Sequence, residues 1–156
     1  MNRIIAIALI FISRLAIGQT DFKEQFKIFT IESNELGRVE YCTFKSTIDK
    51  KKPILLFIHG SGNEPTFCYQ TDLKTYAWKG FLEIEKYKDS YHVISVSKPG
   101  VPLFDTVQKD PVNFQTSYPL NNEFTNRYSL EWRAKAASLI IDQAIKQLPV
   151  DQSRIL

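Results

Sequence analysis

Residues 53–62 constrain the fold of this 156-residue chain more than any other segment, because a continuous apolar run ends there in a glycine-containing loop. The segment is Pro-Ile-Leu-Leu-Phe-Ile-His-Gly-Ser-Gly. Five consecutive large apolar residues, 54–58, predict a central strand that is covered on both faces, as in a parallel sheet. Glycines after the strand let the backbone approach a ligand closely, and N–H groups there can face an oxygen that develops negative charge.

The remainder of the chain predicts strands that alternate with helices. Such an order is typical of an α/β fold with a mainly parallel sheet and right-handed crossovers, here with an antiparallel hairpin at its amino-terminal edge. The expected elements are hairpin strands at 26–31 and 38–44, the strand at 54–58, a helix at 79–87, a strand at 91–97, an irregular segment at 101–127, a helix at 128–148 and a strand that begins at 154.

The helix expected at 128–148 is amphipathic, and Pro149 prevents it from continuing. Helical spacing places seven apolar residues on the face that we expect to pack: Leu130, Ala134, Ala137, Ile141, Ala144, Ile145 and Leu148.

The strand, the His-Gly loop after it and the order of elements over residues 25–156 resemble the amino-terminal part of the α/β-hydrolase superfamily. The resemblance implies a serine hydrolase that cleaves ester or peptide-like acyl bonds. It implies that the backbone N–H of Ser61, or as second choice Gly62, donates to the oxyanion, while His59 and Gly60 shape the loop. The alternative interpretation of this segment is an ordinary turn at the end of a strand.

The sequence contains no Gly-x-Ser-x-Gly motif. In the resembled family this motif follows a strand that begins as residues 154–156 do, so we expect a chain that is truncated before the nucleophile elbow and inactive by itself. Ser61 lacks both the motif and a base beside it, and the family takes its triad histidine from a late loop rather than from the position of His59. The second hypothesis is a non-catalytic exported binding or interaction domain with an α/β sandwich core.

Residues 98–102, Lys-Pro-Gly-Val-Pro, follow the strand expected at 91–97. Ligand crevices form at this end of the strands in open α/β sheets. We expect Phe104, Phe114 and Tyr118 either to line a substrate cleft there or to cover the sheet.

Residues 1–18 have the pattern of a secretory signal peptide. Arg3 precedes the apolar run 4–12, and Ala-Ile-Gly at 16–18 is a small-x-small cleavage site before Gln19. We therefore expect an exported protein, periplasmic or secreted, with residues 19–156 forming the hydrolase-like domain and no stable membrane insertion. Arg14 is irregular at its position and leaves an uncleaved anchor as the alternative.

Charge and composition exclude several other classes of function. The net charge of +3 includes Arg3 and Arg14, and without residues 1–18 there remain 18 basic and 17 acidic residues, which gives no electrostatic footprint for nucleic acid. Two histidines and no Cys-x-x-Cys or His-Glu-x-x-His predict no metal site and no cofactor.

We expect Cys42 and Cys68 to be separate thiols, with a disulfide between them as the alternative. The expected partner is a small ester or peptide-like substrate.

Overall fold

The computed structural model describes residues 22–60, 62–70, 75–78, 84–109 and 116–154. Nine strands and two α-helices lie within these residues, together with four short 3-10 helices. The bounds are β1 Phe26–Ser33, β2 Gly37–Phe44, β3 Ile54–Phe57, β4 Phe67–Gln70, β5 Thr75–Trp78, β6 His92–Val96, β7 Phe104–Thr106, β8 Gln108–Lys109, β9 Thr116–Ser117, α2 Asn122–Arg127 and α3 Leu130–Gln147. The 3-10 helices are η1 Phe22–Gln25, η2 Lys45–Thr47, η3 Ile84–Tyr87 and η4 Gln152–Arg154.

The main sheet has four strands in the order β1-β2-β6-β3. The expected hairpin is present: β1 and β2 pair antiparallel over eight residues, and Gly37 at φ 75° begins β2 directly after the turn. β2 pairs antiparallel with β6, and β6 pairs parallel with β3. The carboxyl ends of β3 and β6 therefore lie side by side at one edge of the sheet.

The fold class expected from the sequence, a mainly parallel α/β-hydrolase-like sheet, is wrong. The molecule is mostly β-sheet, and its main sheet is mixed, with two antiparallel pairings and one parallel pairing. The physical reason is that segments expected as irregular, or given no element, form short strands in the structure. Aromatic residues, which favour strands, occupy much of β4 and β5.

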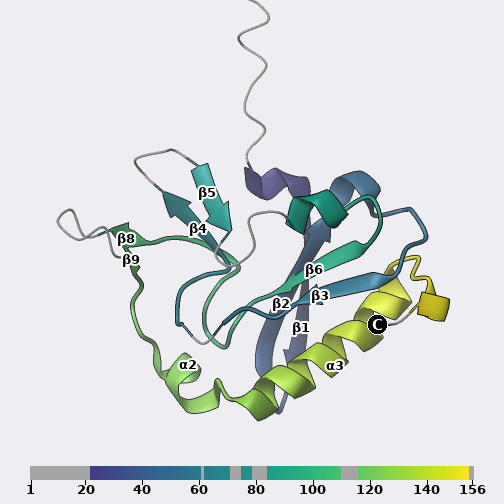
Figure 1. Ribbon diagram of the computed structural model, residues 1–156. Helices are drawn as coiled ribbons and strands as arrows, with labels where there is room; N and C mark the ends of the chain where they lie inside the picture. The colour runs from purple at the N-terminus through teal and green to yellow at the C-terminus, as the bar shows by residue number, and fades with distance from the viewer. Residues whose placement is uncertain (1–21, 61, 71–74, 79–83, 110–115, 155–156) are drawn as a thin grey trace, which may run out of the picture.

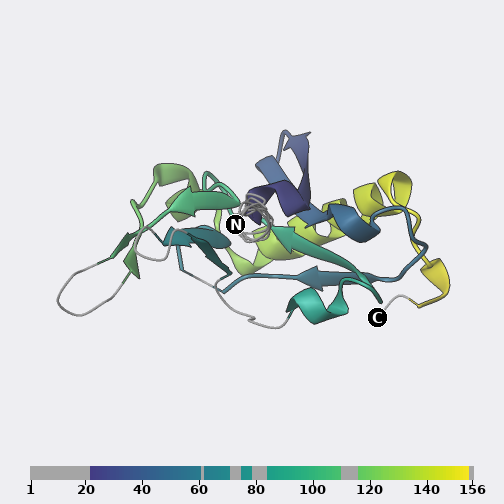
Figure 2. The same ribbon diagram turned by 90° about the horizontal axis from the view of Figure 1, so that it is seen from above.

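A second sheet contains these short strands in the order β5-β4-β7, and β8 pairs with β9. β4–β5 and β8–β9 lie at one end of the molecule, while the carboxyl end of α3 lies at the other (Figures 1 and 2). Phe104, expected to line a cleft or cover the sheet, is 9% exposed in β7 and stacks on Phe67 with ring centroids 4.4 Å apart. It belongs to an aromatic core and not to a cleft, whereas Phe114 lies outside the described residues.

Helix α3 lies along one face of the main sheet, as Figure 1 shows. Its first turn is capped by Ser129, whose hydroxyl accepts from the Trp132 N–H at 3.1 Å. The buried face differs from the expected one: it consists of Trp132, Ala136, Ile140 and Ala144, while Leu130 is 76% exposed. The indole of Trp132 donates to the Leu36 carbonyl at 3.1 Å, and this bond fixes the rotation of the helix on the sheet.

Three further expectations change in the structure. β3 is an edge strand of the main sheet within the described residues, and its four side chains are half-buried instead of covered on both faces. Of the helix expected at 79–87, residues 84–87 form a 3-10 turn and 79–83 lie outside the described residues. Residues 152–154 form a 3-10 turn where a strand was expected to begin at 154, and 155–156 are also outside the described part.

Both cysteines are buried free thiols, so the expectation of separate thiols is confirmed. Burial raises the pKa of the Cys42 thiol well above its usual range. The Cys68 thiol lies 3.3 Å from the Pro65 carbonyl, to which it donates. Both thiols are buried, so neither is placed for nucleophilic chemistry.

Candidate functional site

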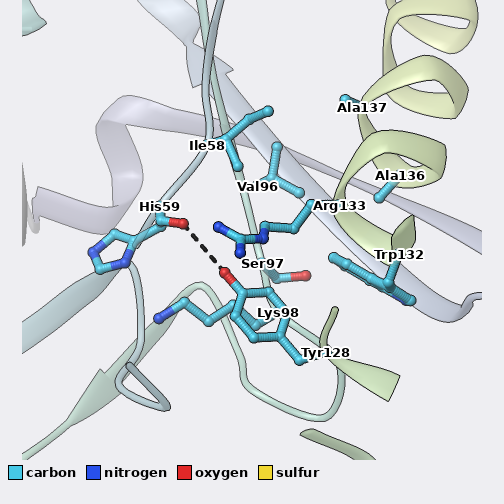
Figure 3. A pocket seen from close by; sticks show the side chains of 10 residues that line it. All are labelled: Ile58, His59, Val96, Ser97, Lys98, Tyr128, Trp132, Arg133, Ala136 and Ala137. Carbon is cyan, nitrogen blue, oxygen red and sulfur yellow. Dashed lines mark hydrogen bonds between the residues drawn. The ribbon is translucent and has the colours of Figure 1, made fainter. Parts of the chain in front are cut away.

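The candidate site lies where the parallel strands β3 and β6 end. Residues 58–60 and 62–66 follow β3 and residues 97–101 follow β6, so the His-Gly loop and the Lys-Pro-Gly turn are neighbours. The start of α3 and Tyr128, two residues before it, complete the site, and Figure 3 shows side chains from all three segments around one cavity. Backbone geometry at strand ends positions the loop, and side chains from distant segments hold it.

Tyr128 holds the first part of the loop. Its hydroxyl lies 3.2 Å from the His59 carbonyl and 3.0 Å from the Gly60 carbonyl and donates to them, as the dashed line to His59 in Figure 3 shows. Burial raises the pKa of Tyr128, so the hydroxyl keeps its proton and remains a donor at neutral pH. The guanidinium of Arg133 stacks on the ring of Tyr128 at 5.2 Å from the centroid.

Lys98 holds the second part of the loop. Its side chain is 3% exposed, and its ammonium group donates to the Gly62 carbonyl and, at 2.9 Å, to the Glu64 carbonyl. A buried ammonium is costly to desolvate, and hydrogen bonds to carbonyl oxygens offset part of that cost. Pro99 in the same turn is fully buried, and its ring restricts the backbone directly after Lys98.

These contacts determine which way the peptide groups of the loop face. In a planar trans peptide the C=O of one residue and the N–H of the next point in opposite directions. Because the carbonyls of His59 and Gly62 face Tyr128 and Lys98, the N–H groups of Gly60 and Asn63 are turned away from them. Within the described part of the chain, the N–H groups of Gly60, Gly62 and Asn63 have no hydrogen-bond acceptor.

The two glycines leave open space on the loop. Neither has a positive φ, so neither is required by a left-handed backbone conformation. A Cβ built on Gly60 would meet nothing within 4 Å among the described residues, and one on Gly62 would reach only the Glu64 carboxylate at 4.0 Å. The glycines therefore allow close approach from outside and are not needed for the turn itself.

The structure places the expected site residues as follows. Ser61, the first choice of oxyanion donor, lies outside the described residues, while Gly60 and Gly62 are exposed in the loop. His59 contacts Phe57 edge-on at 6.2 Å, and its carbonyl is the group that Tyr128 binds. His92 lies buried in β6, with its Nε2 3.2 Å from the Pro149 carbonyl, at the opposite end of the strand from the loop.

Sequence reasoning missed the three side chains that organise this site: Lys98, Tyr128 and Arg133. The sequence placed Lys98 only in the segment after the strand expected at 91–97, and Tyr128 and Arg133 only within the helix expected at 128–148. The contacts of Lys98 and Tyr128 with the loop span 34 to 69 residues of sequence. No local pattern predicts such contacts.

A small cavity lies behind the loop. Its volume is about 10 Å³, enough for about one water molecule, and it is lined by Ile58, His59, Val96, Ser97, Lys98, Tyr128, Trp132, Arg133, Ala136 and Ala137. A wider, open groove of about 320 Å³ lies on the other side of Ser97 and Lys98, between the start of β2 and α2. Tyr118, expected at a cleft, donates its hydroxyl to Asp105 at 2.6 Å and lines neither space.

Comparisons with known proteins do not assign a family. No protein-family model, curated protein or solved structure matches the chain. Among the described residues there is no cluster of His, Cys, Asp or Glu that could hold a metal ion. In the same part of the chain, no helix is both long and apolar enough to span a bilayer.

Proposed function

We propose that this chain provides the oxyanion-binding loop of an exported serine hydrolase that acts on ester or peptide-like acyl bonds. One observation carries the proposal: the loop carbonyls are held by Tyr128 and Lys98, while the N–H groups of Gly60, Gly62 and Asn63 have no acceptor in the described part of the chain. Unbonded amide donors in an open glycine loop suit an oxygen that gains negative charge.

The chemistry that such a loop supplies is electrostatic. When a nucleophile attacks an acyl carbon, the carbonyl oxygen becomes an oxyanion, and donors already in place stabilise it without reorganisation. Loss of one such donor typically costs about 2.7–4 kcal/mol of transition-state stabilisation. Tyr128 and Lys98 act as positioning residues here, because they touch the loop carbonyls and would not touch the substrate.

Among the described residues, no serine, histidine and carboxylate form the hydrogen-bonded chain of a catalytic triad. His59 and His92 belong to opposite ends of the main sheet, and Ser97 uses its hydroxyl to accept from the Glu40 N–H at 3.0 Å. The hydrolase proposal therefore requires a nucleophile outside the described residues. This absence favours the second candidate function, an exported binding or interaction domain that uses the same loop without catalysis.

Activity of the complete gene product separates the two candidates. A hydrolase turns over p-nitrophenyl esters and is labelled by a fluorophosphonate probe, whereas a binding domain does neither. In the hydrolase, Tyr128→Phe should lower kcat/KM about tenfold or more, because the loop amides lose their fixed direction. The matched control is Tyr87→Phe at an exposed position, which should leave kcat/KM unchanged.

The same assay on the 156-residue chain tests the role given to Ser61. We expect no ester turnover and no labelling, because the described residues pair no serine with a histidine and a carboxylate, and an oxyanion donor without a nucleophile cannot form an acyl-enzyme. Labelling at Ser61 would contradict the assignment and make that residue the nucleophile.

Export is the second part of the proposal, and it rests on the sequence of residues 1–18, which lie outside the described residues. The signal-peptide pattern places cleavage between Gly18 and Gln19. Intact-mass measurement on protein from the cell envelope and the medium should show a chain that begins at Gln19. A mass that retains residues 1–18 would favour the anchored form instead.

A further inference from the structure

The cavity behind the loop has an unusual charge composition. Of its ten lining residues, Lys98 and Arg133 carry positive charges, and none is an aspartate or glutamate. The ammonium of Lys98 is bonded to the Gly62 and Glu64 carbonyls, so among the described residues Arg133 is the cation that faces this space, and no carboxylate lies on its wall. Such a wall attracts an anion.

The guanidinium of Arg133 is the less satisfied of the two cations. Its Nε is buried and has no hydrogen-bond partner among the described residues. Within those residues its recorded contact is the ring of Tyr128, which offers a face and no acceptor. Figure 3 shows the guanidinium reaching from α3 toward the space between His59 and Tyr128. A buried donor without an acceptor costs about 1–3 kcal/mol, so a bound acceptor there would be stabilising.

We propose that this cavity binds a carboxylate group through Arg133. The volume of about 10 Å³ admits one oxygen, and the remainder of the ligand stays at the mouth of the cavity. A carboxylate is planar and presents two oxygens in the geometry of the guanidinium fork, so one oxygen accepts from Nε and the other from a terminal nitrogen. The additional oxygens of a tetrahedral phosphate would also have to lie at the mouth, so we expect phosphate to bind no more tightly than acetate.

The site is separate from the proposed oxyanion loop. The cavity lies on the side of the loop where Tyr128 meets the carbonyls, whereas the amides of Gly60 and Asn63 face away from their holding groups. Carboxylate binding therefore does not depend on hydrolysis, and the two proposals can fail independently. If both hold, Tyr128 connects them, because Arg133 stacks on the ring whose hydroxyl holds the loop.

The side-chain Nε–H signal of Arg133 in a ¹H–¹⁵N spectrum tests the proposal directly. Acetate, added at constant ionic strength to the full 156-residue chain, should shift this signal saturably, and neutral acetamide should not. Arg133→Gln identifies the signal and should weaken acetate binding about tenfold or more, measured by the shifts of neighbouring backbone amides. Arg127→Gln, which removes a surface arginine bonded to the Glu35 carbonyl, is the matched control and should leave binding unchanged.

Three outcomes would overturn the inference: an Arg133 signal that acetate does not move, equal acetate affinity in Arg133→Gln and the unaltered chain, or tighter binding of inorganic phosphate than of acetate at the same signal. The titration of the unaltered chain decides the question even if Arg133→Gln fails to fold. This measurement does not use ester turnover. A failure of the carboxylate proposal can therefore be distinguished from a failure of the proposed hydrolase.

Discussion

Replacing Tyr128 by Phe removes a single hydroxyl and keeps the ring that packs beside Trp132, with centroids 6.0 Å apart. The hydroxyl lies 3.2 Å from one carbonyl and 3.0 Å from the next, but it has one proton, so the variant loses the equivalent of about one hydrogen bond. A net bond is worth about 0.5–1.5 kcal/mol, and water can reach the exposed Gly60 carbonyl afterwards. We expect a loss of about 1 kcal/mol in the free energy of unfolding.

Urea unfolding at neutral pH measures this loss, and a thermal melt should show a decrease of about 2–4 °C for a chain of this size. The pH dependence gives a second readout. Because the folded pKa of Tyr128 is raised, its stabilisation is fully present below the unfolded pKa and is lost as pH rises through the folded value. The difference between the two proteins should therefore shrink at strongly alkaline pH.

The amide signals of the loop give a third readout of the Tyr128→Phe substitution. Without the hydroxyl, the peptide groups after His59 and Gly60 are free to rotate, so their amide signals should shift and broaden in a ¹H–¹⁵N spectrum. Tyr87→Phe, at a position 42% exposed, should change stability by less than about 0.5 kcal/mol and leave the loop signals in place. Equal stability of Tyr128→Phe and the unaltered chain, with unchanged loop signals, would refute the view that this hydroxyl holds the loop.

Three other substitutions test the surrounding structure by urea unfolding. Gly100 has φ 65°, and a Cβ there would lie 2.6 Å from Asn121 Oδ1. Gly100→Ala should therefore lower the free energy of unfolding by more than about 1 kcal/mol. An unchanged free energy would contradict the backbone geometry. Gly60→Ala should change stability by less than about 0.5 kcal/mol, because its Cβ would point into open space; a large loss would mean that the loop is closed. Burial and the nearby charge of Lys52 lower the pKa of His92, so the free energy of unfolding should fall as the pH drops below about 6.5. The variant His92→Gln should show a weaker pH dependence. The same slope in both proteins would exclude His92 as its source.

The sequence predicted the elements that depend on local patterns. The hairpin of β1 and β2 was expected from alternating residues around a turn, and α3 was expected within two residues of its observed ends. The buried face of α3 was not, because the side chains of Trp132 and Ile140 pack into the core on the main sheet while Leu130 stays 76% exposed; the Trp132 indole also donates to the Leu36 carbonyl. Helical spacing fixes which residues share a face but not which face a neighbouring strand will accept.

The short strands were missed because their pairing is non-local. β4 pairs in parallel with β7, so Phe67 lies opposite Phe104, and neither segment is long enough to show a period. The polar and proline-rich composition of residues 101–127 favoured a loop, whereas tertiary pairing produced β7, β8 and β9. Strand propensity in such segments depends on the partner.

The sequence predicted where the site lies but not which side chains hold its loop. The position of the loop after β3 followed from the apolar run and the glycines. The groups that orient it, Tyr128 and Lys98, are distant in sequence and have no motif. The glycines were expected to let the backbone approach a ligand closely, and among the described residues a Cβ on Gly60 or Gly62 would meet nothing closer than 4.0 Å.

A crystal structure of the chain with p-nitrophenyl methylphosphonate, a stable anionic analogue of the tetrahedral intermediate, tests the central claim most directly. The account predicts a phosphonate oxygen about 2.7–3.1 Å from the Gly60 amide nitrogen and from at least one of the Gly62 and Asn63 nitrogens, with the Tyr128 and Lys98 contacts intact. A phosphonate bound elsewhere, or a loop whose carbonyls rather than amides face the anion site, would contradict it.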